Sequence, residues 1–145
     1  MIRVAGHTRS TGSRVFPEDA ARELFVNCCG YQHFMTKDFS IQRPGGRPDY
    51  QILYVSKGCG HYQYFARESP EIYWIHFLGT QSDGLLERYG IRSGFLGQHQ
   101  HLKQLFDEII LECQLRKPCF QEVVTADFHK LLALLHRHSL SLHTS

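Results

Sequence analysis

The sequence lacks any apolar run that approaches the roughly 20 residues needed to cross a bilayer. Its first 16 residues also lack the continuous apolar stretch of a secretory signal, because polar residues interrupt them throughout. We therefore expect a cytoplasmic protein with no membrane contact.

Cysteine is present but without a metal-binding or disulfide pattern. The chain has five cysteines, an odd number, and none stands in a C-x-x-C or C-x-x-H spacing. This argues against both a disulfide framework and a zinc site. We expect reduced and mostly buried thiols at Cys28, Cys29, Cys59, Cys113 and Cys119.

Concentrated positive charge is missing as well. Sixteen Lys and Arg against 14 Asp and Glu give a formal net charge of +2, and the basic residues are scattered. Binding to nucleic acid phosphates calls for a basic stripe or patch. This segment alone is expected to bind DNA poorly.

The chain carries none of the common catalytic signatures. It contains no G-x-S-x-G, P-loop or Rossmann fingerprint, and no pair of carboxylates stands in a special environment. We expect neither enzymatic activity nor a cofactor.

The 145 residues suit a single domain that is mainly β at first and helical afterwards. Residues 1–15 are polar and without periodicity, and predict a flexible N-terminal arm. Gly30 marks either a β-bulge or a close approach of backbone within a strand, and residues 43–48 predict a loop. Alternating apolar residues predict strands at 24–33, 39–41, 50–56, 62–65 and 72–77.

Apolar residues at steps of three and four predict helices after residue 80. Ser82 is the expected N-cap of a short helix that ends before Gly90, and long helices over 98–116 and 120–138 should pair antiparallel. Both long helices carry apolar side chains beyond a single contact face, Leu111 on the first and Leu134 on the second. These side chains could cover the β structure or form a subunit interface, and the pattern favours neither use. The residues predicted for dimerisation are Phe128, Leu131, Leu134 and Leu135.

Three motifs in this order carry a family resemblance. They are Ile41-Gln42-Arg43-Pro44 with Asp49–Val55 and Gly58, then Trp74-Ile75-His76-Phe77-x-Gly79, then the two amphipathic helices. From about Phe16 onward the chain resembles the N-terminal regulatory domain of AraC-family transcriptional regulators. The resemblance implies a cupin-like double-stranded β-barrel (jelly roll) over residues 16–79, followed by an antiparallel helical hairpin over residues 80–145. The barrel would bind a small effector, often a sugar, and the helices would form a homodimer.

The chain departs from this family in two places. Strands that the family carries after the first glycine turn are missing, since Gly60-His61 runs almost directly into Tyr62. We expect either an omitted stretch or a deletion, and favour the former because lost strands would leave unpaired edges. The family's helix-turn-helix domain is also missing, so DNA contact is expected only through a further C-terminal domain.

The predicted effector site combines strand and loop residues. The resemblance places an effector-contacting arginine at Arg43, although an arginine in a loop can simply be solvated. Trp74 would form a flat wall for a sugar ring, with Ile72 and His76 on the same face of the strand. The alternative for Trp74 is a role in the core. Hydroxyl donors would come from Tyr62 and Tyr64.

Two rival functions remain open. A metal-dependent cupin enzyme, such as an isomerase or a dioxygenase, would need an H-x-H pair on a strand. That spacing occurs only at His99 and His101 and at His136 and His138, on predicted helices where residues two apart diverge. The other rival is a dimerisation module with a vestigial pocket. The leading hypothesis is a sensor in which effector binding shifts the arm or the helices.

Overall fold

The computed structural model describes residues 2–9, 15–33, 39–40, 49–57, 63–64, 71–94, 96–97 and 99–144. For residues 2, 39–40, 57, 63–64 and 141–144 only the backbone is described. Within these ranges, no helix combines the length and the apolar character that spanning a membrane requires.

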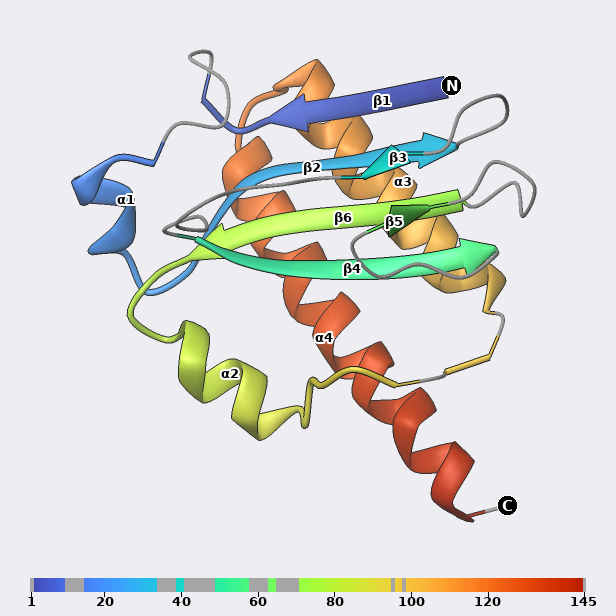
Figure 1. Cartoon of the computed structure of the whole chain (residues 1–145). Coiled ribbons are helices and arrows are strands. Elements are labelled where there is room, and N and C mark those ends of the chain that lie inside the picture. The colour runs from blue at the N-terminus through green and yellow to red at the C-terminus, as the bar shows by residue number, and fades with distance from the viewer. Residues whose placement is uncertain are drawn as a thin grey trace.

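One antiparallel sheet of four strands dominates the structure (Figure 1). Its order is β1-β2-β6-β4, from β1 (Ile2–His7) through β2 (Phe25–His33) and β6 (Glu71–Leu78) to β4 (Tyr50–Lys57). Two short strands, β3 (Phe39–Ser40) and β5 (Gln63–Tyr64), form a separate antiparallel pair. The expected strands over 24–33, 50–56 and 72–77 are thus confirmed to within two residues.

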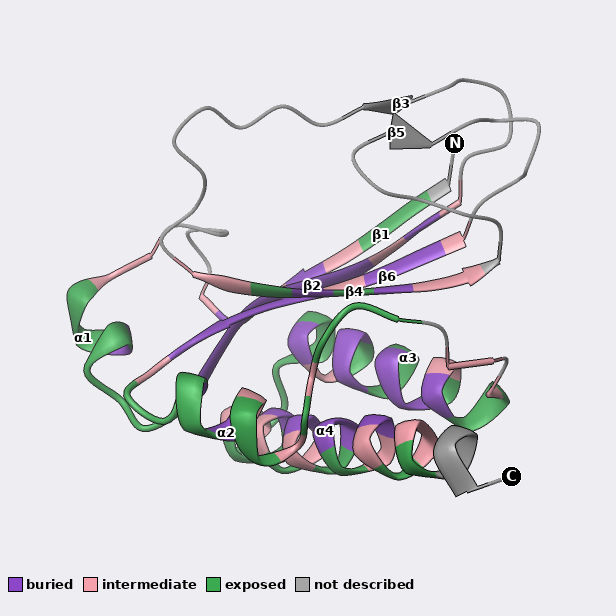
Figure 2. Ribbon diagram, turned by 60° about the horizontal axis from the view of Figure 1, so that its bottom comes forward, coloured by how far each residue is buried: buried purple, intermediate pink, exposed green. Residues whose placement is uncertain are grey.

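The predicted jelly-roll barrel is wrong. The four-stranded sheet is open, with β1 and β4 as its two edges. Alternating apolar residues are compatible with a barrel or with one open sheet, because both bury every second side chain of a strand. Helices, instead of a second sheet, cover the buried face in this chain (Figure 2).

The predicted arm is also wrong for residues 2–7, which form the edge strand β1 on β2. Gly6 explains how this strand packs on the helices. A Cβ atom at Gly6 would lie 2.7 Å from Cβ of Cys113, so only glycine lets the strand approach the following helical layer so closely.

In the part of the chain that the structure describes, four helices accompany the sheet. They are α1 (Pro17–Ala20), α2 (Ser82–Arg88), α3 (Gln100–Leu115) and α4 (Phe120–Thr144). The short connection after Leu115 turns the chain through Arg116 and Cys119, both with positive φ, and α4 runs back along α3 (Figure 1). Gly90 follows α2 with φ of +60°, as expected, but Gln81 is the N-cap and Ser82 is the first helical residue.

Aromatic side chains join the helices to the sheet. Phe77 of β6 lies with its ring centroid 4.7 Å from that of Phe128 of α4. Phe106 of α3 stacks on Tyr73 of β6 and Tyr54 of β4, at 5.1 and 5.8 Å. Burying a large apolar side chain contributes about 1.5–3 kcal/mol, so these contacts form the main core of the molecule.

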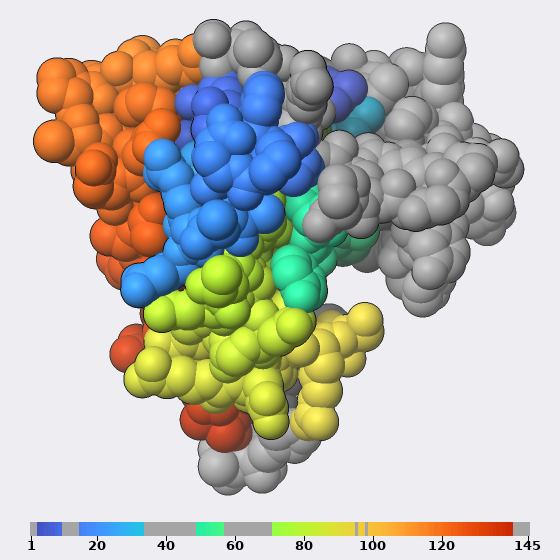
Figure 3. All heavy atoms as spheres, turned by 90° about the vertical axis from the view of Figure 1, so that its left-hand side faces the viewer, coloured from blue at the N-terminus to red at the C-terminus, as the bar shows by residue number. Residues whose placement is uncertain are grey.

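The segment around α1 closes one end of the two layers. In Figure 3 this blue segment lies between the orange beginning of α4 and the yellow-green chain that enters α2. Backbone N–H groups of Thr80 and Gln81 donate to the carbonyls of Arg22 and Glu23, at 2.8 and 2.9 Å. Gly79 permits this contact, because its φ is +132° and a Cβ there would lie 2.5 Å from the Glu23 oxygen.

The described cysteines are free thiols, as expected. Cys28, Cys29 and Cys113 are buried and Cys119 is exposed, while Cys59 lies outside the described residues. The hydrogen bond between Cys29 and Cys113 raises the pKa of Cys29 and lowers the pKa of Cys113. The two thiols therefore act as one polar contact between β2 and α3.

Replacing Phe128 tests whether α4 is held by the core described above. Phe128→Ala removes a fully buried ring and should lower the free energy of unfolding by about 3–5 kcal/mol. Val123→Ala, on the same helix at a side chain 40% exposed, should change it by no more than about 0.5 kcal/mol. Urea unfolding followed by far-UV circular dichroism measures both, and equal losses would contradict the packing.

Candidate functional site

The face of the sheet that α3 and α4 do not cover carries three of the predicted site residues, Ile72, Trp74 and His76. Because side chains alternate along a strand, Tyr73, Ile75 and Phe77 point to the helices, and Ile72, Trp74 and His76 point to the other side. We call that side the outer face. The register of the sheet extends it over all four strands, with Arg3, Ala5 and His7 on β1 and three rows across β2, β6 and β4. Its rows are Cys28, His76 and Gln51, then Gly30, Trp74 and Leu53, then Gln32, Ile72 and Val55.

Trp74 lies across the backbone of β2. A Cβ atom at Gly30 would meet the Trp74 ring at 2.2 Å, so the indole occupies the space that any other side chain would fill. This confirms the close approach expected at Gly30. Cζ of Arg3, on β1, lies 5.4 Å from the ring centroid in a cation–π arrangement. Trp74 remains half-buried, and Leu53 beside it in the sheet is 46% exposed.

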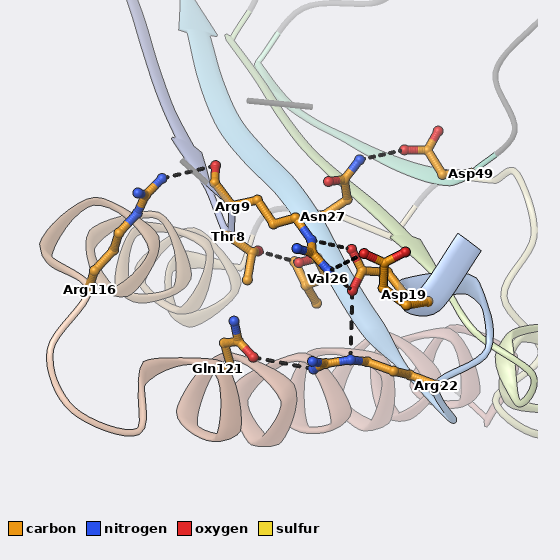
Figure 4. A network of polar contacts seen from close by, with 10 residues as sticks. Thr8, Arg9, Asp19, Arg22, Val26, Asn27, Asp49, Arg116 and Gln121 are labelled. Atoms are coloured by element: carbon orange, nitrogen blue, oxygen red, sulfur yellow. Dashed lines mark hydrogen bonds and ion pairs between the residues drawn. The ribbon is translucent and has the colours of Figure 1, made fainter. Parts of the chain in front are cut away.

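A buried polar cluster stands at one end of the outer face. Nδ1 of His76 lies 3.4 Å from Oδ1 of Asp49, and the side chains of the two residues are 3% and 0% exposed. Asn27 donates from Nδ2 to Oδ2 of Asp49 at 3.3 Å (Figure 4). A carboxylate that is shielded from water needs such partners. Because His76 and Asp49 are buried, we infer a structural role: their contacts hold the start of β4 against β2 and β6.

A β-bulge creates this cluster. The register between β2 and β6 shifts by one residue between Val26 and Cys28, and Asn27 is the extra residue. Val26 therefore faces the helices while Cys28 pairs with His76 on the outer face. Bulges redirect side chains in this way and are frequent near functional sites.

The end of β1 is fastened to both α1 and α3 (Figure 4). Arg9 donates two hydrogen bonds to the carboxylate of Asp19, at 2.5 and 2.7 Å, and Asp19 is 1% exposed. Arg116, after α3, donates to the carbonyls of His7 and Arg9 at 2.9 and 3.1 Å. Gln114 donates to the carbonyl of Ala5 at 3.2 Å. Strand β1 thus connects the Trp74 region to the end of α3.

His7 shares the outer face of β1 with Arg3. Burial lowers the pKa of His7, and the positive charges of Arg116 and Arg3 lower it further. Both effects favour the neutral form of its imidazole, whereas Arg3 carries a permanent positive charge on this strand.

The structure brings together only part of the predicted effector site. Ile72, Trp74 and His76 share the outer face, as expected. Arg43 and Tyr62 lie outside the described residues, and of Tyr64 only the backbone is described. No geometry therefore connects these three residues to Trp74.

The residues predicted for dimerisation pack inside the chain. Phe128 and Leu131 are 0% exposed, Leu135 is 6% exposed, and Leu134 packs against the same core as a partly buried side chain. They cover the sheet, which was the alternative use of this helical stripe. An interface between subunits would need other side chains.

Three residues of the outer face were given no role from the sequence. Arg3 stood in the segment expected to be a mobile arm, and Asn27 reaches the face only through the bulge. Asp49 begins the Asp49–Val55 motif, and its place there was the one sequence feature that could have pointed to a role for it.

Comparison with models of known protein families finds no match, and neither does comparison with curated proteins. The likeness to AraC-family regulators therefore rests on the sequence motifs alone. Among the residues that the structure describes, no group of three or more His, Cys, Asp or Glu side chains is arranged to hold a metal ion.

The contact between Gly30 and Trp74 can be tested through the only tryptophan of the chain. Gly30→Ala should displace the indole, lower the free energy of unfolding by about 1–3 kcal/mol and shift the Trp74 emission to longer wavelength. Gly84→Ala is the control, because nothing lies within 4 Å of a Cβ there. It should raise stability by about 1 kcal/mol as a helical substitution and leave the emission unchanged. Unaltered stability and emission in Gly30→Ala would contradict the geometry.

Proposed function

We propose that this chain is the ligand-sensing domain of an AraC-type transcriptional regulator, that it works in the cytoplasm, and that it binds a small polar effector on its outer face. The carrying observation is Trp74, a half-buried indole on the sheet face that no helix covers, with Arg3 over its ring. The corrected fold moves the proposed binding place from the interior of a barrel to the accessible part of the outer face around Trp74 and Leu53.

The chemistry of this face favours a carbohydrate. An indole ring offers a flat apolar surface to the C–H side of a sugar ring, and the neighbouring Leu53 extends that surface. The guanidinium of Arg3 supplies several donors in a fixed plane, which suits hydroxyl groups or the carboxylate of a sugar acid. Aromatic surface and a convergent donor together provide both affinity and orientation.

Strand β1 offers a path from this face to the helices. An effector that binds the Arg3 side chain contacts strand β1 directly. The carbonyl groups of the same segment accept hydrogen bonds from Gln114 and Arg116 at the end of α3. Such coupling requires that the effector binds two arrangements of β1 with different affinity. The Arg9–Asp19 ion pair holds the observed arrangement.

Self-association and DNA binding belong to the same proposal. The side chains of Leu111 and Leu115 are 52% and 51% exposed and lie four residues apart on α3. They are available to a second copy of the chain, unlike Phe128 and Leu131. DNA would be bound through a further domain attached to such a dimer. The rival metal-dependent cupin enzyme gains no support from the described residues, which include no three-ligand group.

Titration of Trp74 fluorescence with a panel of pentoses, hexoses and uronic acids tests the proposal. A member of the panel should change the emission in a saturable way. Arg3→Ala should weaken that binding tenfold or more, because a hydrogen bond to a charged group contributes about 1.5–3 kcal/mol. Arg92→Ala, an exposed arginine between α2 and α3, is the matched control and should bind as the unaltered chain does.

Two outcomes would contradict the proposal. One is a panel without any saturable change in emission. The other is equal affinity in Arg3→Ala and Arg92→Ala, which would place the effector away from the outer face.

A further inference from the structure

Three histidines come together where the start of α3 meets the C-terminal half of α4. Nε2 of His101 lies 2.6 Å from Nε2 of His138. The ring of His99 stacks on that of His138, with centroids 3.6 Å apart and planes inclined by 15°. His101 is exposed and the other two are half-buried, so solvent and ions reach the cluster.

The predicted helix over 98–116 placed both His99 and His101 on one helix, where residues two apart diverge. His99, however, is not helical. It is the N-cap of α3 and has extended backbone angles, φ −135° and ψ 105°. Its ring therefore turns toward α4 beside that of His101, and the antiparallel helices bring in His138 from the far end of the chain.

The cluster is held in place from outside. Nε2 of His99 lies 2.6 Å from the carbonyl oxygen of Leu96, which fixes the orientation of its ring. That ring in turn packs flat on His138 and leaves Nε2 of His138 directed at His101. Orientation of a ligating histidine by surrounding groups is a regular feature of metal sites.

We propose that His101 and His138 form a binding site for a divalent first-row transition metal such as Zn²⁺, Ni²⁺ or Cu²⁺. Imidazole nitrogen is a preferred ligand of these ions, whereas Mg²⁺ and Ca²⁺ prefer oxygen. With metal–nitrogen bonds of about 2.0–2.1 Å, two ligands stand about 3.3 Å apart in a tetrahedral site. The two nitrogens need to separate by roughly 0.7 Å from their present distance, a small rotation for the exposed His101 side chain.

Two protein nitrogens make this an open site. No third His, Cys, Asp or Glu among the described residues completes it, so water occupies the remaining positions. The bound ion links the first turn of α3 to α4 about 37 residues further along the chain. Because a metal that binds only the folded state stabilises it by mass action, this site fastens the end of the helical pair.

Isothermal titration calorimetry of the full chain, prepared without a histidine tag, tests the site with Zn²⁺ and Ni²⁺. Mg²⁺ is the negative control. One ion should bind per chain, and the melting temperature should rise with Zn²⁺ concentration. His101→Gln and His138→Gln should each weaken binding at least tenfold. His129→Gln, on α4 but outside the cluster, is the matched control and should bind as the unaltered chain does.

Circular dichroism first verifies that each variant is folded. If either glutamine variant fails to fold, ¹⁵N NMR of the imidazole nitrogens in the unaltered chain replaces it. Zn²⁺ should then shift Nε2 of His101 and His138, and Mg²⁺ should shift neither. Unchanged affinity in both glutamine variants, no binding at millimolar Zn²⁺, or shifts confined to other histidines would overturn the site.

Discussion

The packing of Tyr73, Ile75 and Phe77 against α3 and α4 is the contact on which the rest of the structure depends. These three side chains of the central strand β6 are 4%, 0% and 0% exposed. An amphipathic helix gains most of its stability from burying its apolar stripe, and an antiparallel sheet commonly packs one of its faces on a core. The apolar stripes of the helices and the apolar face of the sheet therefore bury each other. This packing decides which side chains of β6 point to the helices and which point away.

The outer face is a consequence of the same alternation. Once Phe77 and Tyr73 point to the helices, Trp74 and His76 must point away. The bulge at Asn27 and the missing side chain at Gly30 then shape that face, since one turns polar atoms toward Asp49 and the other makes room for the indole. The proposed binding face thus arises from two local irregularities in β2 on a regular scaffold.

The strands and helices could be predicted well from the sequence, but their arrangement in space could not. Strands and long helices were found because their periods of two and 3.6 are local properties of the chain. The barrel was wrong because alternation reports which side chains are buried and not what buries them. The edge strand β1 was missed because its short apolar pattern runs into the Ser-, Thr- and Arg-rich residues that follow it, and because Gly6 makes its contact with Cys113 through the absence of a side chain. His99 was placed inside a helix because apolar periodicity does not mark the residue at which a helix begins, and the structure has His99 as the extended N-cap of α3.

The same distinction holds at the candidate site. Trp74 and its neighbours on β6 could be placed on one face from alternation alone. Arg3 and Asn27 could not, because each reaches the face through strand pairing or a bulge, which no local pattern reveals. The resemblance to AraC-family regulators supplied Arg43, which lies outside the described residues.

Nuclear Overhauser contacts between aromatic rings test the two-sided arrangement most directly. The account predicts cross-peaks between Phe77 and Phe128 and between Tyr73 and Phe106, whose ring centroids lie 4.7 and 5.1 Å apart. It predicts none between the Trp74 indole and either helix. Cross-peaks from the indole to Phe106 or Phe128 would show that Trp74 belongs to the covered face, and the proposed binding surface would not exist.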